Sequence, residues 1–253
     1  MRTTNRTIGA PYRALALLSM CIVGASCSAQ EPSVTLQIQI TKHVKGAQHV
    51  SAAVASDASD IAAWLLPVNQ AGQPADAASA PKPAKLIQRD KTFVPHLLVV
   101  QTGAAVQFPN EDPFFHNVFS LFDGKRFDLG LYESGTSRTV HFERSGVSFL
   151  FCNIHSEMNA VVLSVDTPYF GVSDKSGKLT IPNVPDGRYR LQVYYERSSP
   201  EDLKTLERIV SVADGTRALG TVQVNDNEGF KLDHKNMYGQ DYVPPSNTNP
   251  SYH

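Results

Sequence analysis

An all-β protein is the fold class that this sequence predicts, and two observations carry the prediction. Short apolar segments follow one another along the chain, separated by turn dipeptides such as Asp123-Gly124 and Ser145-Gly146. Between 85 and 166 these segments show no helical period. Strands at this spacing are typical of a β-sandwich or a β-barrel.

The predicted strands can be justified in order. The segment 34–40 alternates apolar and polar residues, as a half-buried strand does, and 59–67 carries Trp64, the only tryptophan. The Ala- and Pro-rich stretch 71–84 is predicted to be an exposed linker. The strands that follow are 97–100, 105–108, 118–121, 139–142, 147–151 and 160–165. A hairpin-like block over 171–196, a short helical turn over 201–208 and strands at 209–212 and 219–224 complete the series.

Composition limits the function. The chain has 253 residues, of which 42% are hydrophobic, enough for one large or two small domains with real cores. Its 23 Lys and Arg residues are balanced by 24 Asp and Glu residues, for a net charge of −1. No positive excess exists to neutralise phosphates, so a nucleic-acid partner is excluded.

Residues 1–29 are predicted to be a secretory signal peptide. An apolar, uncharged run over 14–25 follows three arginines and is too short to span a membrane. Small residues precede a cleavage point after Ala29. Cleavage there removes three of the 23 basic residues and none of the 24 acidic ones, which leaves 20 against 24 and a net charge of −4.

A second cleavage is the alternative. Gly24-Ala-Ser-Cys27 loosely resembles a bacterial lipobox, which would make Cys27 a lipid-modified N-terminus. The protein is therefore expected to be exported or periplasmic, with a lipoprotein as the alternative. A membrane is a partner only if Cys27 carries a lipid.

The cysteine count points to a metal. Cys21 and Cys27 lie in the signal region, so Cys152 is the single cysteine of the mature chain. Exported proteins usually pair their cysteines. A single cysteine in an exported protein has no disulfide partner within the chain, so the leading interpretation is that it is a metal ligand.

One loop and one upstream histidine supply a complete donor set. Cys152, His155 and Met158 lie within seven residues that directly follow an apolar strand, and His116 lies beside the strand 118–121. One thiolate, two imidazoles and one thioether match a trigonal copper site with a weak axial Met. The sequence therefore predicts one type 1 copper per chain and no catalytic residue.

The stretch 84–168 resembles the cupredoxins, the small blue copper proteins. The resemblance rests on Phe93-Val-Pro95, Thr102-Gly103, Val106, Phe108 and His116-Asn117, followed by a C-x2-H-x2-M loop that resembles the ligand loop of amicyanin. It implies a Greek-key β-sandwich.

By the same resemblance, the copper ligands are His116, Cys152, His155 and Met158. Asn117 is then the residue behind the ligands that steadies the Cys152 sulfur and ties the two ligand loops together.

The chain also resembles bacterial exported proteins labelled "methylamine utilization protein", through Phe127–Tyr132 and Asp166–Phe170. Two features depart from the amicyanin pattern. Ile154 and Ser156 stand where prolines flank the histidine, and Glu157 adds a negative charge before Met158. In cupredoxins the second histidine is the usual electron port, so Glu157 bears on the identity of the partner.

Other chemistry was weighed for the same residues. A Cys–His nucleophilic pair lacks an orienting Asn or Asp in the sequence. Zinc could use Cys152, His116 and His155, but it has little use for Met158. His96 and His141 lie in strand-like stretches and are expected to be surface or hydrogen-bonded residues. His43 and His49 flank a loop of small residues, where weak accessory metal binding is an alternative, and His234 and His253 lie in the tail.

A second β-sandwich is expected around the first. The block 174–189 resembles carboxypeptidase-regulatory-like and transthyretin-like sandwiches, whose first strands normally lie just upstream. Here the copper region occupies that place. The expected domains are therefore a signal peptide over 1–29, a discontinuous sandwich over 33–69 and 169–226, a cupredoxin domain over 84–168 and a disordered tail over 227–253.

The function that follows is an outer-sphere electron carrier rather than an enzyme, with a redox protein of unknown identity as its partner. Weak, transient interfaces suit such a carrier. Two alternatives stay open: a copper-binding or delivery protein, and a structural or binding module that copper merely stabilises.

Overall fold

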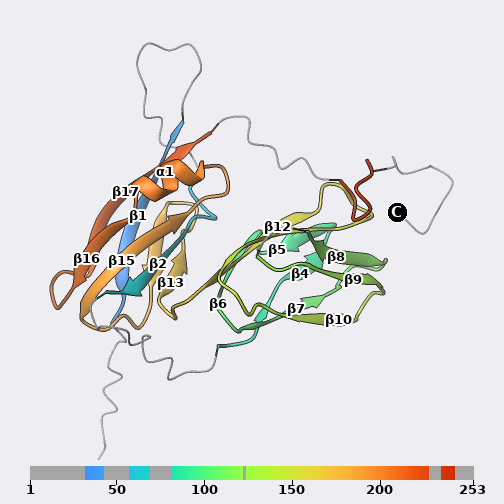
Figure 1. Cartoon of the computed structure of the whole chain (residues 1–253), viewed down its shortest axis with the longest axis horizontal. Coiled ribbons are helices and arrows are strands. Elements are labelled where there is room, and N and C mark those ends of the chain that lie inside the picture. The colour runs from blue at the N-terminus through green and yellow to red at the C-terminus, as the bar shows by residue number, and fades with distance from the viewer. Residues whose placement is uncertain (1–31, 43–56, 69–80, 122–123, 228–234, 243–253) are drawn as a thin grey trace, which may run out of the picture. The chain divides into compact units, whose positions relative to one another are not determined.

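The computed structural model describes residues 32–42, 57–68, 81–121, 124–227 and 235–242. The predicted signal peptide, Cys27, His43, His49 and His234 lie outside these residues. The described residues form β-strands and one short helix, so the all-β prediction is confirmed (Figure 1). No helix within them is long and apolar enough to cross a membrane.

Two sheets contain the first two strands of the chain. The three-stranded sheet has the order β14-β1-β17, with β1 Val34–Lys42, β14 Lys178–Ile181 and β17 Ala218–Asp226. The four-stranded sheet has the order β13-β2-β15-β16, with β2 Ala62–Pro67, β13 Phe170–Val172, β15 Gly187–Tyr194 and β16 Arg208–Val212.

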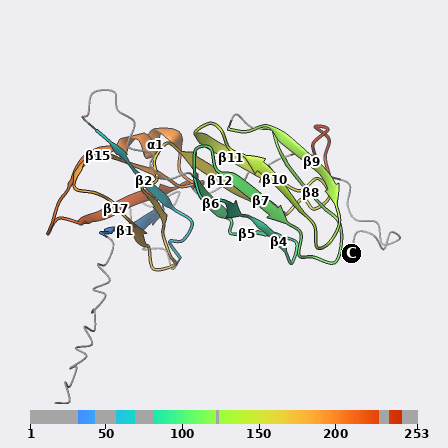
Figure 2. The same cartoon turned by 90° about the horizontal axis from the view of Figure 1, so that it is seen from below.

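Three further sheets come from the middle of the chain (Figure 2). The five-stranded sheet has the order β6-β12-β11-β8-β9, with β6 Leu97–Gln101, β8 His116–Ser120, β9 Phe127–Tyr132, β11 Gly146–Phe151 and β12 Asn159–Val165. The second has the order β10-β7-β3, with β3 Ala84–Lys85, β7 Ala105–Pro109 and β10 Ser137–His141. A hairpin joins β4 Ile87–Arg89 and β5 Thr92–Val94.

The strand pairs separate the chain into two groups. β1 pairs antiparallel with β14 and parallel with β17, and β2 pairs with β13 and β15. The strands from 84 to 165 pair among themselves. This pairing is compatible with a cupredoxin inserted into a second sandwich, and the domain boundaries themselves remain a prediction.

The hairpin expected within 171–196 does not form, because β14 pairs with β1 whereas β15 pairs with β2 and β16 in another sheet. Other elements differ slightly from their predicted bounds. The strand expected from residue 59 begins at Ala62, because Asp60 has a φ of 59°, which strand backbone does not adopt. The strand expected at 118 begins two residues earlier, so His116 belongs to it. The helical turn is α1 Pro200–Thr205, where the Ser199 side chain caps the amide of Asp202 at 3.0 Å.

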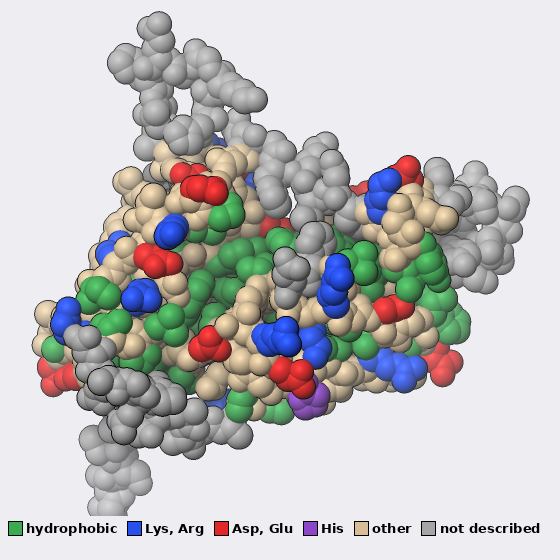
Figure 3. Space-filling view, viewed as in Figure 1, with side chains coloured by type: hydrophobic (Ala, Val, Ile, Leu, Met, Phe, Trp, Pro, Cys, Tyr) green, Lys and Arg blue, Asp and Glu red, His purple; other side chains and the backbone are tan. Residues whose placement is uncertain are grey.

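Alternation of side chains builds the cores. In β1, Val34, Leu36, Ile38 and Ile40 are buried and belong to one core with residues of β14, β15 and β17. A second core gathers the middle strands and contains Cys152 and Met158. A third, smaller core combines residues of both strand groups. Acidic and basic side chains are interspersed on the face that Figure 3 shows.

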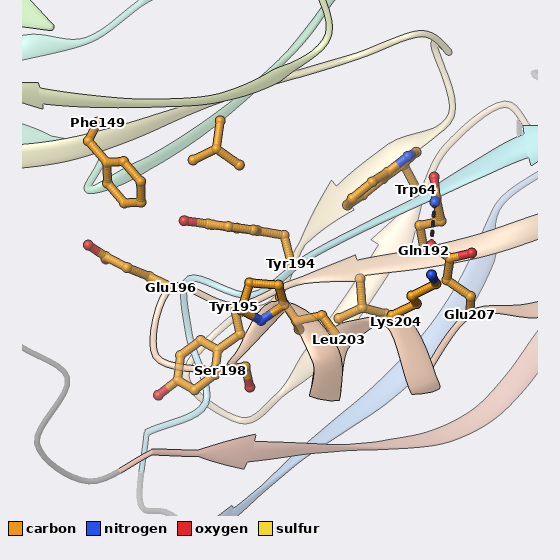
Figure 4. Close-up of a pocket in the computed structure, with 13 residues that line it drawn as sticks. Trp64, Phe149, Gln192, Tyr194, Tyr195, Glu196, Ser198, Leu203, Lys204 and Glu207 are labelled. Atoms are coloured by element: carbon orange, nitrogen blue, oxygen red, sulfur yellow. Dashed lines mark hydrogen bonds between the residues drawn. The ribbon is translucent and has the colours of Figure 1, made fainter. Parts of the chain in front are cut away.

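A hollow of about 540 Å3 lies beside the third core (Figure 4). Trp64, Phe149, Tyr194 and Leu203 are among its lining residues, and none of the predicted copper ligands is. The Tyr194 hydroxyl has no hydrogen-bond partner among the described residues.

One ion pair predicts a pH dependence of stability. His96 Nε2 lies 2.6 Å from a carboxylate oxygen of Glu196, and this hydrogen bond raises the pKa of His96 although burial opposes it. A raised folded-state pKa contributes stability that is fully present below the unfolded pKa of about 6.5 and is lost as the pH rises through the folded value. Glu196→Gln should therefore lower the melting temperature most near pH 6, and the difference from wild type should shrink towards pH 9.

Thermal melts between pH 6 and pH 9 test this expectation. Glu207→Gln is the matched control, because Glu207 accepts a hydrogen bond from Gln192 instead of facing a histidine. If the melting temperatures of wild type and Glu196→Gln differ by the same amount at every pH in this range, the prediction is wrong.

Candidate metal centre

Two segments bring the predicted donors together. His116 is the first residue of β8, and Cys152 directly follows β11. The loop from Cys152 to Met158 is closed by its own backbone, since the amide of Met158 donates to His155 O at 3.0 Å and the amide of Cys152 donates to Met158 O at 3.2 Å. The short loop therefore holds three of the four predicted donors beside the end of one strand.

The ligand atoms of three residues form one cluster. Sγ of Cys152 lies 3.8 Å from Nδ1 of His116 and 3.5 Å from Nδ1 of His155. The three donor atoms all lie within 4.8 Å of one another. Met158 is fully buried in the same core as Cys152. Three of the predicted donor atoms thus lie together, and the residue predicted as the fourth donor is buried in the same core.

Cys152 is a free and fully buried thiol. Burial raises the pKa of the Cys152 thiol, although hydrogen bonds from the backbone amides of Asn117, Ile154 and His155 work in the opposite direction. A metal must therefore displace a proton when it binds, and its affinity should rise with pH.

Burial also keeps the two imidazoles neutral. It lowers the pKa of His116, although the neighbouring Asp112 carboxylate opposes the shift. Burial lowers the pKa of His155 to about 4, and the electrostatic effects of His116 and Lys91 act in the same direction. Neutral imidazole is the form that binds metals, so both rings are ready to act as ligands near neutral pH.

The outer nitrogens of the two rings have different surroundings. Nε2 of His116 lies 2.7 Å from Oδ2 of Asp112. Nε2 of His155 is shielded from water and has no hydrogen-bond partner among the described residues. The Phe114 ring lies 5.6 Å from the His155 ring, centroid to centroid, and Lys91 Nζ lies 5.3 Å from the Phe114 centroid.

Asn117 connects the two ligand segments. Its Oδ1 accepts a hydrogen bond from the amide of Asn153 at 3.3 Å, and its Nδ2 donates to Oδ1 of Asp128 at 2.7 Å. Its backbone amide interacts with the Cys152 sulfur. These contacts link the segment of His116 to the loop that begins at Cys152.

The tail supplies contacts that sequence reasoning missed. Within the segment expected to be disordered, residues 235–242 form a turn against the ligand loop. The amide of Met237 donates to Oδ1 of Asn153 at 2.9 Å, and the Tyr242 hydroxyl donates to Cys152 O at 2.9 Å. Burial raises the pKa of Tyr242. No local pattern marks this turn, because its partners lie 84 and 90 residues earlier.

The donor set fits copper. A thiolate and two imidazoles satisfy both Cu(I) and Cu(II), and a buried thioether is a donor that zinc does not need. His96 and His141 stand apart from the cluster, the first paired with Glu196 and the second exposed. Glu157 is exposed at the edge of the ligand loop.

Comparisons with known proteins give structural likenesses alone, since no protein-family model and no curated protein matches the chain. The chain is similar to a copper-containing nitrite reductase (NirK) from Thermus scotoductus SA-01, at 21% identity over 37% of this chain and a TM-score of 0.32, and it spans only 25% of that chain.

Two smaller proteins match over most of their own length. A purple cupredoxin from Nitrosopumilus maritimus is 23% identical over 32% of this chain and 99% of its own, with a TM-score of 0.30. A reduced Cu(I) form of an amicyanin mutant at pH 4 is 18% identical over 41% of this chain and 98% of its own, with a TM-score of 0.32.

Proposed function

We propose that this protein is an exported copper protein of the cupredoxin type that carries electrons between redox partners. The observation that carries the proposal is the cluster of one thiol sulfur and two imidazole nitrogens within 4.8 Å of one another. His116, Cys152 and His155 would hold the metal, and Met158 would serve as the weak axial donor. When bound, copper supplies a one-electron couple at this site.

The residues around the donors suit a site that changes little between oxidation states. His116, Cys152 and Met158 are fully buried, and the ligand loop is closed by its own hydrogen bonds. Rigid burial holds the donor atoms in place and keeps water out. A site that needs no rearrangement favours fast electron exchange.

His155 is the proposed exit for the electron. Its outer nitrogen is covered, so a partner would approach through neighbouring side chains such as Phe114. Phe115, next in the chain, is 49% exposed and offers apolar surface of the kind that transient redox contacts use. The negative charge of Glu157 near this loop favours a partner whose docking surface is basic.

The first test is the visible absorption spectrum of the purified protein after loading with Cu(II), recorded before and after ascorbate. An intense band that bleaches on reduction and returns on reoxidation supports the proposal. A colourless protein that still binds one equivalent of copper would reject a thiolate–copper site and favour a delivery or structural role. Transfer of copper to an acceptor protein would favour delivery.

Met158→Leu tests the axial donor. The substitution conserves volume in the core and should cost less than about 1.5 kcal/mol of stability. Copper should stay bound, and the reduction potential should rise because the axial sulfur is lost. Redox titration of the band measures the shift, with Met237→Leu as the matched control that removes a thioether elsewhere. Complete loss of copper from Met158→Leu would contradict a weak axial role.

A further inference from the structure

The two histidines of the proposed site are held in different ways. In each ring, Nδ1 faces the Cys152 sulfur and Nε2 lies on the opposite side of the ring, buried in the protein. On the Nε2 side of the His116 ring lies the carboxylate of Asp112, whose Oδ2 is 2.7 Å from Nε2. Behind His155, no described residue accepts or donates a hydrogen bond at Nε2. A negative charge therefore lies against only one of the two imidazoles.

Asp112 is itself held in place from several sides. The side chain is 5% exposed. The amide of Asp90 donates to its Oδ1 at 2.7 Å, and the amide of Lys91 donates to its Oδ2 at 3.0 Å. Its own amide donates to Oδ1 of Asn110 at 3.0 Å.

The turn that supplies two of these donors has an unusual backbone. Asp90 and Lys91 connect β4 to β5 and have φ values of 54° and 55°. Two consecutive left-handed residues make the kind of turn that normally carries Asn or Gly. A turn with this backbone costs conformational energy for Lys91, and it directs both amides at the Asp112 carboxylate.

The hydrogen bonds define the charge of Asp112 and the tautomer of His116. Both backbone groups are obligatory donors, so the Asp112 oxygens that face them are acceptors. When Nδ1 of His116 is free to bind a metal, the ring proton is on Nε2 and points at Oδ2. The arrangement is a carboxylate–histidine–metal relay of the kind that raises the basicity of a ligand imidazole.

We propose that Asp112 is a positioning residue that holds His116 in the Nε2–H tautomer and lowers the reduction potential of the bound copper. The inference rests on the proposed function. A buried negative charge favours the more highly charged Cu(II) over Cu(I) by Coulomb attraction, and it does so with little screening by water. His155 has no such partner, so the two imidazoles contribute unequally.

The test compares the reduction potentials of copper-loaded wild type and Asp112→Asn. The variant keeps the size of the side chain and removes its charge. The ratio of Cu(II) to Cu(I) affinity should fall about tenfold, which corresponds to a rise in potential of about 59 mV. Equal potentials, or a lower potential in Asp112→Asn, would overturn the proposal.

Asp128→Asn is the matched control. Its carboxylate also lies near the site, but it bonds to Asn117 Nδ2 rather than to a ligand ring, and it is exposed to water. Asp128→Asn should shift the reduction potential much less than Asp112→Asn does. A shift as large in Asp128→Asn would mean that general charge near the site, rather than the bond to His116, sets the potential.

A second measurement needs neither copper nor a variant. Nitrogen-15 NMR of the metal-free wild type reports which ring nitrogen of His116 carries the proton. Nε2–H supports the proposal, and Nδ1–H overturns it even if Asp112→Asn does not fold. If the wild type shows no copper band, the proposed function fails, while the NMR result still decides the tautomer.

Discussion

Substitution of Cys152 by serine is expected to abolish the intense visible band completely. Cys152 is the only cysteine of residues 30–253, so no other thiolate can supply the charge-transfer transition. A serine hydroxyl does not ionise in this pH range and is a poor ligand for Cu(I). Absorption spectra of the Cu(II)-loaded variant and wild type, at equal protein concentration, measure the loss.

The same substitution should lower stability. Cys152 is fully buried, and a serine hydroxyl there exchanges a weakly polar thiol for a group that needs a hydrogen-bond partner. The imidazoles and amides around the sulfur can supply such a partner, so the loss should stay below the cost of an unsatisfied buried hydroxyl, about 1–3 kcal/mol. Urea unfolding of the metal-free proteins measures this separately from the colour.

His141→Ala is the control, because it removes an exposed imidazole outside the proposed donor set. Its band should equal that of wild type. A band that survives in Cys152→Ser would show that the colour does not come from this thiolate, and the proposed type 1 site would then be rejected.

Gly177→Ala is expected to lower the free energy of unfolding by about 3 kcal/mol or more. Gly177 has a φ of 79°, and a Cβ added there would lie 2.3 Å from the carbonyl oxygen of Ile38. The strained conformation costs about 1–3 kcal/mol, and the clash adds to it because backbone must move. The same glycine accepts the Ile38 amide at 2.7 Å, so movement also weakens the attachment of β1.

Gly215→Ala isolates the conformational part of this cost. Gly215 has a φ of 82°, nearly the same as Gly177, but an added Cβ meets nothing within 4 Å. It should cost about 1–2 kcal/mol. Urea unfolding of both variants gives the two values, and equal losses would show that the contact with Ile38 O carries no energy.

Much of the fold could be predicted because it depends on local pattern. Alternation in 34–40 marks β1, since side chains on a strand point to opposite faces and one face here is buried. The bounds that shifted did so for reasons the pattern does not show, such as the positive φ of Asp60 before β2. The pairing of β1 with β17, parallel and some 180 residues apart, has no local signal at all.

The candidate site divides in the same way. Cys152, His155 and Met158 lie in one heptapeptide, so their chemistry and closeness could be predicted together. His116, beside the strand 118–121, completed the donor set, and the family resemblance added the role of Asn117. Asp112 could not be found, because it precedes His116 by four residues outside any helix, and that spacing predicts no contact in extended chain.

Residue type and short spacing were enough to predict the strand-forming segments, the lack of a basic charge excess and the proposed thiolate, thioether and imidazole donors. Three contacts follow from the folded chain instead: His116 meets Cys152 across 36 residues, the buried Asp112 carboxylate bonds to the His116 ring, and the turn 235–242 lies against the ligand loop. Such contacts form only where the packing of the whole chain offsets the entropy lost in closing long loops. A local sequence pattern contains no information about either quantity.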